Sequence, residues 1–402
     1  MPRAEVAGPT PREQEVLDLI DPADLVALTR ALVRVPGTNP PGEEQGRAEL
    51  LASVCRERGF SVDVTEVAPG RPNVSAVLPG GDGSGLLLLG HTDVVPLGEG
   101  WTVDPFGGEL RDGRVYGRGS TDMLGGLAAS VVAMDALRRA GVALAGPLEL
   151  AAVVDEEMMG LGIRDYVRDP GRLRLAGCIV AEPTDLQLII AARGASYVEV
   201  EIEGVAAHAG NPDDGRNAIY GAAAVVTELE RWHHELAADA HPLVGPATWN
   251  VGVVTGGSGG STVPARCHIA ADRRLLPEED PAEVLAAIRA RLDLLDLPAR
   301  GLGIEVTMPM DMPGFETSAD HPLVRAADSA LATAGGPGLP LAGWTAACDG
   351  GFLARDAGVP VVVLGPGSVA DQAHRPDESV GVDELLVAAR AYALAALRLL
   401  GP

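Results

Sequence analysis

Residues 86–96 read LLLLGHTDVVP, and this stretch decides the fold. Four consecutive leucines predict a strand that is covered on both faces, which is typical of parallel sheets. His91 and Asp93 follow where such a strand would end. Alone, this His-x-Asp could equally be a turn with an incidental histidine. Catalytic groups in open α/β sheets, however, gather beyond the carboxyl ends of the strands, so we expect a site at this edge.

The segments around this strand alternate between strand and helix patterns. Strands separated by helices predict an α/β fold with at least partly parallel order. The predicted strands cover residues 61–67, 73–79, 148–157, 177–183 and 359–367. The predicted helices cover residues 22–35, 46–59, 126–140, a segment from about 162, 321–335 and 384–400.

The middle of the chain has a different pattern. ASYVEVEIEG at 195–204 alternates with period two, which predicts a strand with one wet face. A helix at 216–237, two strands, a helix at 281–295 and a strand at 303–310 come next. This β-α-β-β-α-β order is that of a small ferredoxin-like α+β sandwich. We therefore predict a discontinuous catalytic domain (1–192 and 309–402) with an α+β domain inserted at 193–308.

Composition and charge exclude several classes of protein. A formal charge of -25 argues against nucleic acid and against an anionic membrane surface as partners. The N-terminal twenty residues show no apolar signal-peptide core, and no uncharged apolar stretch approaches membrane-spanning length. The four cysteines lie far apart, without a CxxC pair or a disulfide framework. We expect a cytoplasmic protein that acts on a small molecule.

Further carboxylates and one histidine fall at equivalent strand exits. They are Asp122 in the loop GRGSTDMLGG, Asp155, Glu156 and Glu157 after AAVV, Glu182 after GCIV, and His374 after the Gly-Pro-Gly that ends VVVL. Solvated surface charge rarely produces such a pattern. A carboxylate cluster repels itself and takes up protons unless cations neutralise it. The positions therefore predict a metal centre.

The mixture of side chains also indicates the metal and the chemistry. Two imidazoles with several carboxylates suit zinc or a similar first-row ion better than calcium or magnesium. Two adjacent ions need a bridging carboxylate and can share a water that becomes a hydroxide near neutral pH. Of Glu156 and Glu157, one can bind metal while the other stays free as general base. Asp93 can hold the second ring nitrogen of His91.

These segments resemble the M20 metallopeptidase family, which includes acetylornithine deacetylase, succinyl-diaminopimelate desuccinylase, aminoacylase and glutamate-releasing carboxypeptidases. The resemblance runs from GHTDVVP through GRGSTDMLGG, DEEMMGLG, AEPTD and AHAGNPDDGRNAI to GPGSVADQAHRPDE. It implies these roles: His91 and Glu182 as ligands of one ion, Glu157 and His374 of the other, Asp122 as the bridge, Asp93 as the orienting aspartate and Glu156 as the general base.

The resemblance also gives roles to the inserted domain. It looks like the family's lid, which in most members makes a homodimer. His208 resembles the lid histidine that reaches across the dimer to the developing oxyanion, and Arg274 the arginine that grips a substrate carboxylate. Two positions depart from the family: Leu124 stands where lysine is common, and Ser261 where asparagine is usual.

The function implied by these residues is hydrolysis of the amide bond of an N-acyl amino acid. Two divalent ions, zinc or alternatively cobalt, would supply a bridging hydroxide, with Glu156 as general base. The details around AEPTD and DQAHRPDE look most like the acetylornithine deacetylase and succinyl-diaminopimelate desuccinylase branch. A dipeptidase or carboxypeptidase acting on a short peptide is the alternative within the family. Small-molecule binding or non-hydrolytic catalysis on the same scaffold is the alternative outside it.

Overall fold

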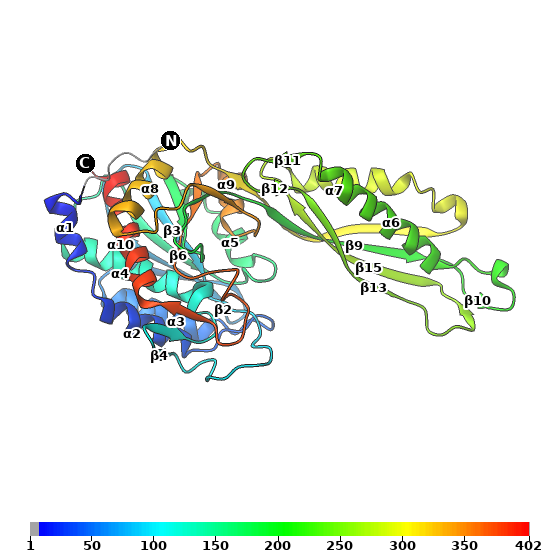
Figure 1. The fold of residues 1–402 in the computed structure, drawn as a ribbon, viewed down its shortest axis with the longest axis horizontal. Helices are drawn as coiled ribbons and strands as arrows, with labels where there is room; N and C mark the ends of the chain where they lie inside the picture. The colour runs from blue at the N-terminus through cyan, green and yellow to red at the C-terminus, as the bar shows by residue number, and fades with distance from the viewer. Residues whose placement is uncertain (1–7, 402) are drawn as a thin grey trace. The chain divides into compact units, whose positions relative to one another are not determined.

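The computed structural model describes residues 8–401 and divides into two compact units. Unit 1 comprises the chain up to Ile190, the segment Glu316–Ala342, and the chain from Phe352 onward. Unit 2 comprises Ala191–Phe315 and Gly343–Gly351. Figure 1 shows the chain passing from unit 1 (blue to green) into unit 2 (green to yellow) and then back into unit 1 (orange to red). The prediction placed the short segment Gly343–Gly351 in the catalytic domain, within 309–402, whereas the structure groups it with unit 2.

The segments of unit 1 supply most of a nine-stranded sheet of order β1-β2-β6-β3-β7-β19-β8-β17, with β18 paired to β8. Residues 191–192 of β8, 315 of β17 and 343–344 of β18 fall in the segments of unit 2. A small sheet of order β20-β5-β4 accompanies it. The strands are β1 Ser61–Ala68, β2 Arg71–Leu78, β3 Gly85–His91, β4 Glu109–Arg111, β5 Arg114–Tyr116, β6 Leu148–Val153, β7 Leu175–Val180, β8 Ile189–Ala192, β17 Phe315–Glu316, β18 Ala342–Trp344, β19 Val361–Val363 and β20 Ser379–Gly381.

The helices of this part of the chain are α1 Pro11–Leu17, α2 Pro22–Val33, α3 Gln45–Glu57, α4 Gly125–Arg139, α5 Leu161–Tyr166, α8 Pro322–Ala334, α9 Gly350–Ala357 and α10 Val382–Leu400. Short turns of other helix types cover Ser120–Leu124 and Pro170–Arg172. Helix α4 packs on β3 and β6, α10 packs on α4 and α8, and α3 packs on β1 and β2 (Figure 1). The α/β class predicted from the strand and helix patterns is confirmed for unit 1.

Parallel pairing brings the predicted site positions to one edge of the sheet. Strand β3 pairs in parallel with β6 and with β7, and β19 pairs in parallel with β7. All seven residues of β3 are buried, as its run of leucines predicts. In the β3–β6 register His91 lies opposite Val153, and Glu182 lies two residues beyond the end of β7. Residues just beyond the ends of these strands therefore meet at the carboxyl edge.

One glycine allows the close packing beside this edge. A Cβ atom on Gly126, in the first turn of α4, would lie 2.1 Å from the carbonyl oxygen of Ala181. Real Cβ atoms do not approach that closely, so only glycine lets α4 begin directly beside the residue that precedes Glu182. The next residues of α4, from Leu127 to Leu137, are all buried.

Unit 2 contains a four-stranded antiparallel sheet of order β13-β15-β9-β16. Helices α6 and α7 lie on one side of it (Figure 1), and the buried core of the unit joins residues of the sheet and of both helices. Strand β9 alternates between buried and exposed residues, as predicted. The elements are β9 Gly194–Glu203, β10 Ala207–His208, α6 Ala218–Leu236, β11 Ala240–His241, β12 Gly245–Pro246, β13 Thr248–Gly256, β14 Thr262–Val263, β15 Arg266–Leu275, α7 Pro281–Asp293 and β16 Gly303–Met312, with short 3-10 turns at Pro212–Asp214 and Pro298–Arg300.

No helix within residues 8–401 combines the length and apolar character that a bilayer crossing requires.

Candidate metal centre

The first group of predicted ligands meets at the end of β3. The Nε2 atom of His91 lies 3.2 Å from Asp122 Oδ1 and 3.3 Å from Glu182 Oε1. All three side chains are buried or nearly so, with side-chain exposures of 1, 13 and 5%. Strand β3 supplies His91, the turn before α4 supplies Asp122, and the exit of β7 supplies Glu182. Three segments that are distant in sequence thus converge on one point.

The second group meets on the other oxygen of the same aspartate. The Nε2 atom of His374 lies 3.3 Å from Asp122 Oδ2 and 3.2 Å from Glu157 Oε2. Glu157 lies beyond the end of β6, and His374 stands on the loop after β19 with a backbone φ of 63°. Asp122 therefore faces one imidazole with each of its carboxylate oxygens. The structure brings all five predicted ligands together around this residue.

The electrostatics of the cluster show unbalanced negative charge. Burial alone would lower the pKa of His91, but Glu182 and Asp122 outweigh it and raise the pKa well above 6.5. Hydrogen bonds to Asp122 and Glu157 raise the pKa of His374 to about 10. Burial and the nearby charge of Asp122 raise the pKa of Glu182 to about 7. Without a cation, these side chains therefore bind protons more readily than usual. A metal ion at the same place would neutralise their negative charge instead.

The donor atoms fit a cation. The Nδ1 atom of His91 lies 3.0 Å from the carbonyl oxygen of Asp93, which can only accept, so the ring proton belongs on Nδ1. This tautomer leaves the Nε2 lone pair for a metal. Atom Oε1 of Glu157 is buried and has no hydrogen-bond partner among residues 8–401. A buried carboxylate oxygen that lacks a hydrogen-bond partner and lies beside two histidines fits a residue that binds a metal ion through that oxygen.

Glu156 lies beside these ligands. Its carboxylate, His91 Nε2 or Nδ1 and a Glu182 oxygen lie within 4.8 Å of one another, as do atoms of His91, Asp122 and Glu157. Its side chain is half-buried, whereas Asp155 just before it is buried. The residue predicted as the base is therefore within reach of the ligand set. Its neighbour Glu157 lies 3.2 Å from His374 Nε2, which fits a residue that binds the same metal ion as His374.

The carboxylate of Asp93 lies beside the second ring nitrogen of His91, as expected, and has a further task. Its Oδ1 is in ion-pair range of Nδ1 at 3.6 Å, while the main-chain carbonyl of the same residue lies closer, at 3.0 Å. The carboxylate also accepts hydrogen bonds from the backbone N–H groups of Glu156 at 3.2 Å and Glu157 at 3.1 Å. The main chain of Asp93 thus orients the histidine, and its side chain holds the two glutamates.

A buried ion pair that the sequence did not indicate holds the Asp122 turn. Glu378 is fully buried, and its Oε1 accepts hydrogen bonds from the backbone N–H groups of Thr121 at 2.9 Å and Asp122 at 3.0 Å. Its Oε2 accepts from Arg118 Nη1 at 2.7 Å. Because Glu378 stands four residues after His374, this pair links the loop of one predicted ligand to the turn of another.

Unit 2 carries the remaining predicted residues. His208, in β10, is exposed, and its Nδ1 accepts a hydrogen bond from Gly210 N. Arg274 is about one third exposed and pairs with Asp272 at 2.9 Å. Its neighbour Arg273 is buried and pairs with Glu279. Of the two arginines, Arg274, which resembles the substrate-binding arginine of the family, is the one whose side chain reaches solvent.

A second arginine near Arg274 was not predicted. Burial lowers the pKa of Arg193, and the nearby guanidinium of Arg274 lowers it further. Arg193 Nε donates to the carbonyl of Val244 at 2.7 Å, which fixes the side chain. Arg193 is thus close enough to Arg274 for the two positive charges to interact.

Comparison with known proteins places this fold and site in a family. The model of Peptidase family M20/M25/M40 matches residues 87–398. The chain belongs to this family. As an M20 protein it is a member of a hydrolase family of metallopeptidases and deacetylases.

Individual relatives agree with the M20 assignment. An acetylornithine deacetylase from Klebsiella pneumoniae (strain 342) is 33% identical over 376 residues, which cover 88% of this chain and 92% of that protein. The aminopeptidase PepT from Bacillus cereus ATCC 10987 has a similar fold, with a TM-score of 0.75 at 23% identity over 95% of this chain and 99% of that one. The Bacillus subtilis YXEP protein, described as a dinuclear metal binding peptidase, gives 0.71 at 16% identity over 94% and 98%.

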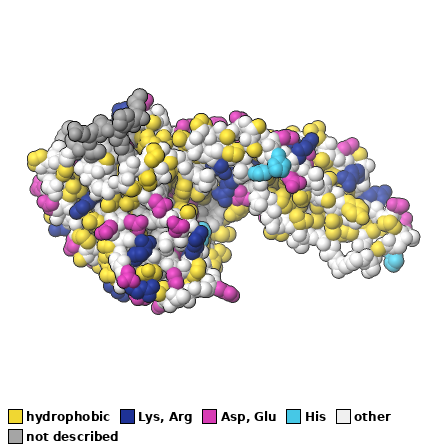
Figure 2. Space-filling model, viewed as in Figure 1, with side chains coloured by type: hydrophobic (Ala, Val, Ile, Leu, Met, Phe, Trp, Pro, Cys, Tyr) yellow, Lys and Arg dark blue, Asp and Glu magenta, His cyan; other side chains and the backbone are white. Residues whose placement is uncertain are grey.

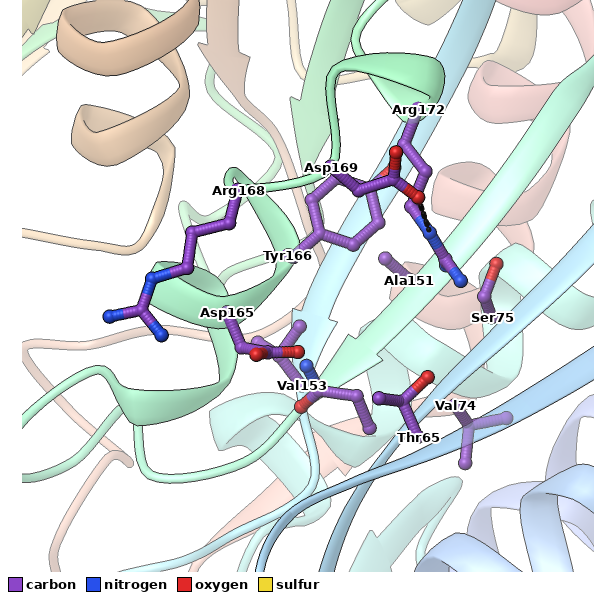
Figure 3. A pocket seen from close by; sticks show the side chains of 11 residues that line it. Thr65, Val74, Ser75, Ala151, Val153, Asp165, Tyr166, Arg168, Asp169 and Arg172 are labelled. Atoms are coloured by element: carbon purple, nitrogen blue, oxygen red, sulfur yellow. Dashed lines mark hydrogen bonds and ion pairs between the residues drawn. The ribbon is translucent and has the colours of Figure 1, made fainter.

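This M20 chain also has a cavity of about 320 Å³ in unit 1 that is lined by β1, β2, β6 and the segment around α5 (Figure 3). One charged residue of its lining, Arg172, lies 3.3 Å from Asp169, also in the lining, and 2.6 Å from Asp63. Ser75 donates a hydrogen bond to Glu149. Within the described part of the chain, none of the predicted site residues lines this cavity.

Proposed function

We propose that the protein hydrolyses the amide bond of an N-acyl amino acid, using two divalent metal ions held at the carboxyl edge of the unit 1 sheet. One ion is assigned to His91 and Glu182, the other to Glu157 and His374, with Asp122 between them. Zinc is the preferred metal and cobalt a substitute, because imidazole and carboxylate ligands suit these ions. One observation carries the proposal: the two oxygens of Asp122 lie 3.2 and 3.3 Å from two different imidazoles.

The chain's own residues have separate tasks in this proposal. The two ions, when bound, polarise the scissile carbonyl and lower the pKa of water. Glu156 accepts the proton of the attacking water and passes it to the leaving amine. Its neighbour Glu157 cannot take this role while it binds a cation. The Asp93 carboxylate, through its bonds to the backbone of both glutamates, keeps the base and the ligand in a fixed relation.

The substrate class is inferred from the charges of unit 2. Arg274 is about one third exposed, and the charge of Arg193 lies within electrostatic range of it. A free carboxylate on the amino-acid part of the substrate fits this pair, since a planar guanidinium binds carboxylate through two parallel hydrogen bonds. The similarity to an acetylornithine deacetylase supports an acyl amino acid over a longer peptide. Hydrolysis of a dipeptide or of a carboxypeptidase substrate would use the same metal ions and the same general base.

We also propose that two copies associate through unit 2. Strand β13 is the edge of the four-stranded sheet, and Val253 and Val254 on it are 49 and 52% exposed. Figure 2 shows hydrophobic side chains gathered on the visible face of unit 2, where β13, β15 and α6 lie. An open edge strand with apolar side chains is a surface on which another strand can pair. His208 would then act on the oxyanion in the partner's site.

A substrate scan with an active-site variant tests the proposal. The zinc-loaded and cobalt-loaded proteins are assayed with N-acetyl amino acids, N-succinyl amino acids and dipeptides. We expect cleavage of an acyl amino acid and a fall in kcat of about 10²- to 10⁴-fold in Glu156→Gln. Zinc affinity should stay within a few-fold in this variant, because Glu156 is not a proposed ligand.

Three results would contradict different parts of this assignment. Cleavage of dipeptides only would keep the metal chemistry and replace the substrate. No cleavage of any compound by the loaded protein, with zinc bound at two equivalents, would support binding or non-hydrolytic catalysis on this scaffold. Turnover that persists in Glu156→Gln would show that another group is the base.

A further inference from the structure

A buried amide, the side chain of Asn39, lies between two buried carboxylates beside the metal centre. Asn39 is 3% exposed, and its Nδ2 lies 2.9 Å from Asp93 Oδ2 and 3.0 Å from Asp155 Oδ1. Its backbone N–H donates to the carbonyl of Val94 at 2.8 Å, and Val94 N donates to Gly37 at 3.0 Å. Asn39 is thus fixed by its main chain to the exit of β3, with both N–H groups of its amide committed.

The two carboxylates that Asn39 joins hold one loop between them. Asp93 accepts the backbone N–H groups of Glu156 and Glu157. Asp155 Oδ2 accepts those of Met159 and Leu161, at 3.2 and 3.3 Å. The loop that carries the proposed base and one proposed ligand therefore depends on the directions in which these two carboxylates point.

The charges around Asn39 explain why an amide suits this position. Two ionised carboxylates so close together repel each other, and burial strengthens the repulsion. A neutral side chain with two N–H donors satisfies one oxygen of each without adding charge. The same oxygen of Asp155, Oδ1, also lies 2.8 Å from Arg71 Nη2, and Arg71 also pairs with Glu44. The asparagine completes a chain of alternating donors and acceptors that ends at the two glutamates.

We propose that Asn39 is a positioning residue for Glu156 and Glu157, acting through Asp93 and Asp155. Its amide sets the orientation of both carboxylates, and these orient the backbone from which the base and the ligand project. Loss of the amide lets the carboxylates turn apart and releases the N–H groups of Glu156 and Glu157. The role of Glu156 as base rests on the proposed function, whereas the ordering of the loop does not.

The test compares Asn39→Leu, which keeps the branched shape but has no donor, with Asn39→Ser, whose hydroxyl can donate to one carboxylate only. Thr317→Val is the matched control. Thr317 is also buried in unit 1, and its hydroxyl donates to the carbonyl of Val361 and accepts from the N–H of the same residue. The readouts are kcat and KM, zinc affinity by calorimetry, and amide hydrogen exchange of the loop 155–162 in the metal-free protein.

We expect Asn39→Leu to lower kcat and zinc affinity by about 10- to 100-fold each, the usual effect of losing a partner behind a metal ligand, with KM changed by less than about threefold. Exchange at Glu156 and Glu157 should be at least about tenfold faster. Asn39→Ser should fall between Asn39→Leu and the unchanged protein. Thr317→Val should leave loop exchange and zinc affinity within about twofold, even if the protein unfolds more easily.

A double variant checks that Asn39 acts through the carboxylates. If it does, adding Asp155→Asn to Asn39→Leu should lower kcat less than the product of the two single effects, because both changes break the same link. Fold-changes that multiply would overturn the mechanism.

Other outcomes address the proposal directly. Unchanged loop exchange and zinc affinity in Asn39→Leu would refute it, as would equal losses in Thr317→Val. If Asn39→Leu does not fold, Asn39→Ser is compared with Thr317→Val and with the unchanged protein in the same assays. If the unchanged protein cleaves none of the substrates, the proposed function fails, but exchange and zinc affinity still decide the role of Asn39.

Discussion

The buried pair of Glu378 and Arg118 offers a sharp test of how the Asp122 turn is held. Glu378→Gln keeps the shape of the side chain and one acceptor oxygen, but it removes the negative charge that faces Arg118. In the structure Glu378 accepts from Thr121 N, Asp122 N and Arg118 Nη1, all within 3.0 Å. The amide can satisfy either the two backbone N–H groups or the guanidinium, and its NH₂ group then faces donors on the other side.

The cost of this change can be worked from the burial of the pair. Glu378 and Arg118 are 0 and 1% exposed, so water cannot replace the lost partner. Breaking a buried pair by removing one member destabilises a protein by about 3–5 kcal/mol. With an m-value of about 3 kcal/mol/M, the urea midpoint of unit 1 should fall by about 1–1.7 M. The turn that carries Asp122 loses an anchor, so zinc affinity should also fall, by about 10- to 100-fold.

Trp101 makes the measurement specific to unit 1. The four tryptophans are Trp101, Trp232, Trp249 and Trp344, and only the first falls in the segments of unit 1. Its ring lies 5.2 Å from the Arg118 guanidinium. Urea titration of the metal-free protein is monitored by fluorescence of a variant in which the other three tryptophans are replaced by phenylalanine.

A double variant decides whether the effect comes from the pair. Arg118→Met with Glu378→Gln leaves no unpaired buried charge, so it should be no less stable than Glu378→Gln alone. The reasoning is refuted if the two single changes simply add, or if Glu378→Gln shifts the midpoint by less than about 0.3 M.

Three further outcomes are expected from the structure. Arg274→Lys should raise KM for a carboxylate substrate about tenfold with kcat nearly unchanged, and Arg193→Met should also raise KM. A fall in kcat alone would show that these arginines do not bind the substrate carboxylate. Mixing His208→Ala with Glu156→Ala subunits should restore about one quarter of full activity if His208 acts across a dimer, and none if it acts within its own subunit. Burial would raise the pKa of Glu13, but Arg398 and Thr10 lower it below 4.5, so its stabilisation is present above pH 4.5 and lost as the pH falls below that. Glu13→Gln should therefore lower the thermal midpoint at pH 7, with the difference shrinking below pH 4.5, and a constant difference would contradict this.

Much of the fold could be predicted because its strongest signals are local. The leucines of β3 and the alternation of β9 each reflect how many faces of the strand are covered, and burial in the structure agrees with both patterns. Helix α5 is only six residues long and gave a weaker signal. That the segment Gly343–Gly351 belongs to unit 2 was not predicted, because its place depends on contacts distant in sequence.

The clustering of the five proposed metal ligands could be predicted because their side-chain types stand at strand exits. The residues that hold these side chains in place could not be predicted from the sequence. Glu378 and Asn39 act on backbone N–H groups and on carboxylates far away in sequence, and nothing in their own segments points to those partners. The side chain of Asp93 was placed on His91 by its spacing, whereas in the structure the shorter contact comes from its main chain. Only three-dimensional distances distinguish these possibilities.

The division of unit 1 between two ends of the chain has a consequence for synthesis. Unit 2 occupies one nearly continuous stretch, Ala191–Phe315, so most of it can fold while the ribosome is still translating the C-terminal part of unit 1. The sheet of unit 1 lacks β19 until residue 363 has emerged, and the site lacks His374 until later still. Until then the growing chain displays His91, Asp122, Glu157 and Glu182 without the fifth proposed ligand. If these residues hold the metal ions as proposed, a chain truncated before His374 should bind zinc more weakly than the whole chain.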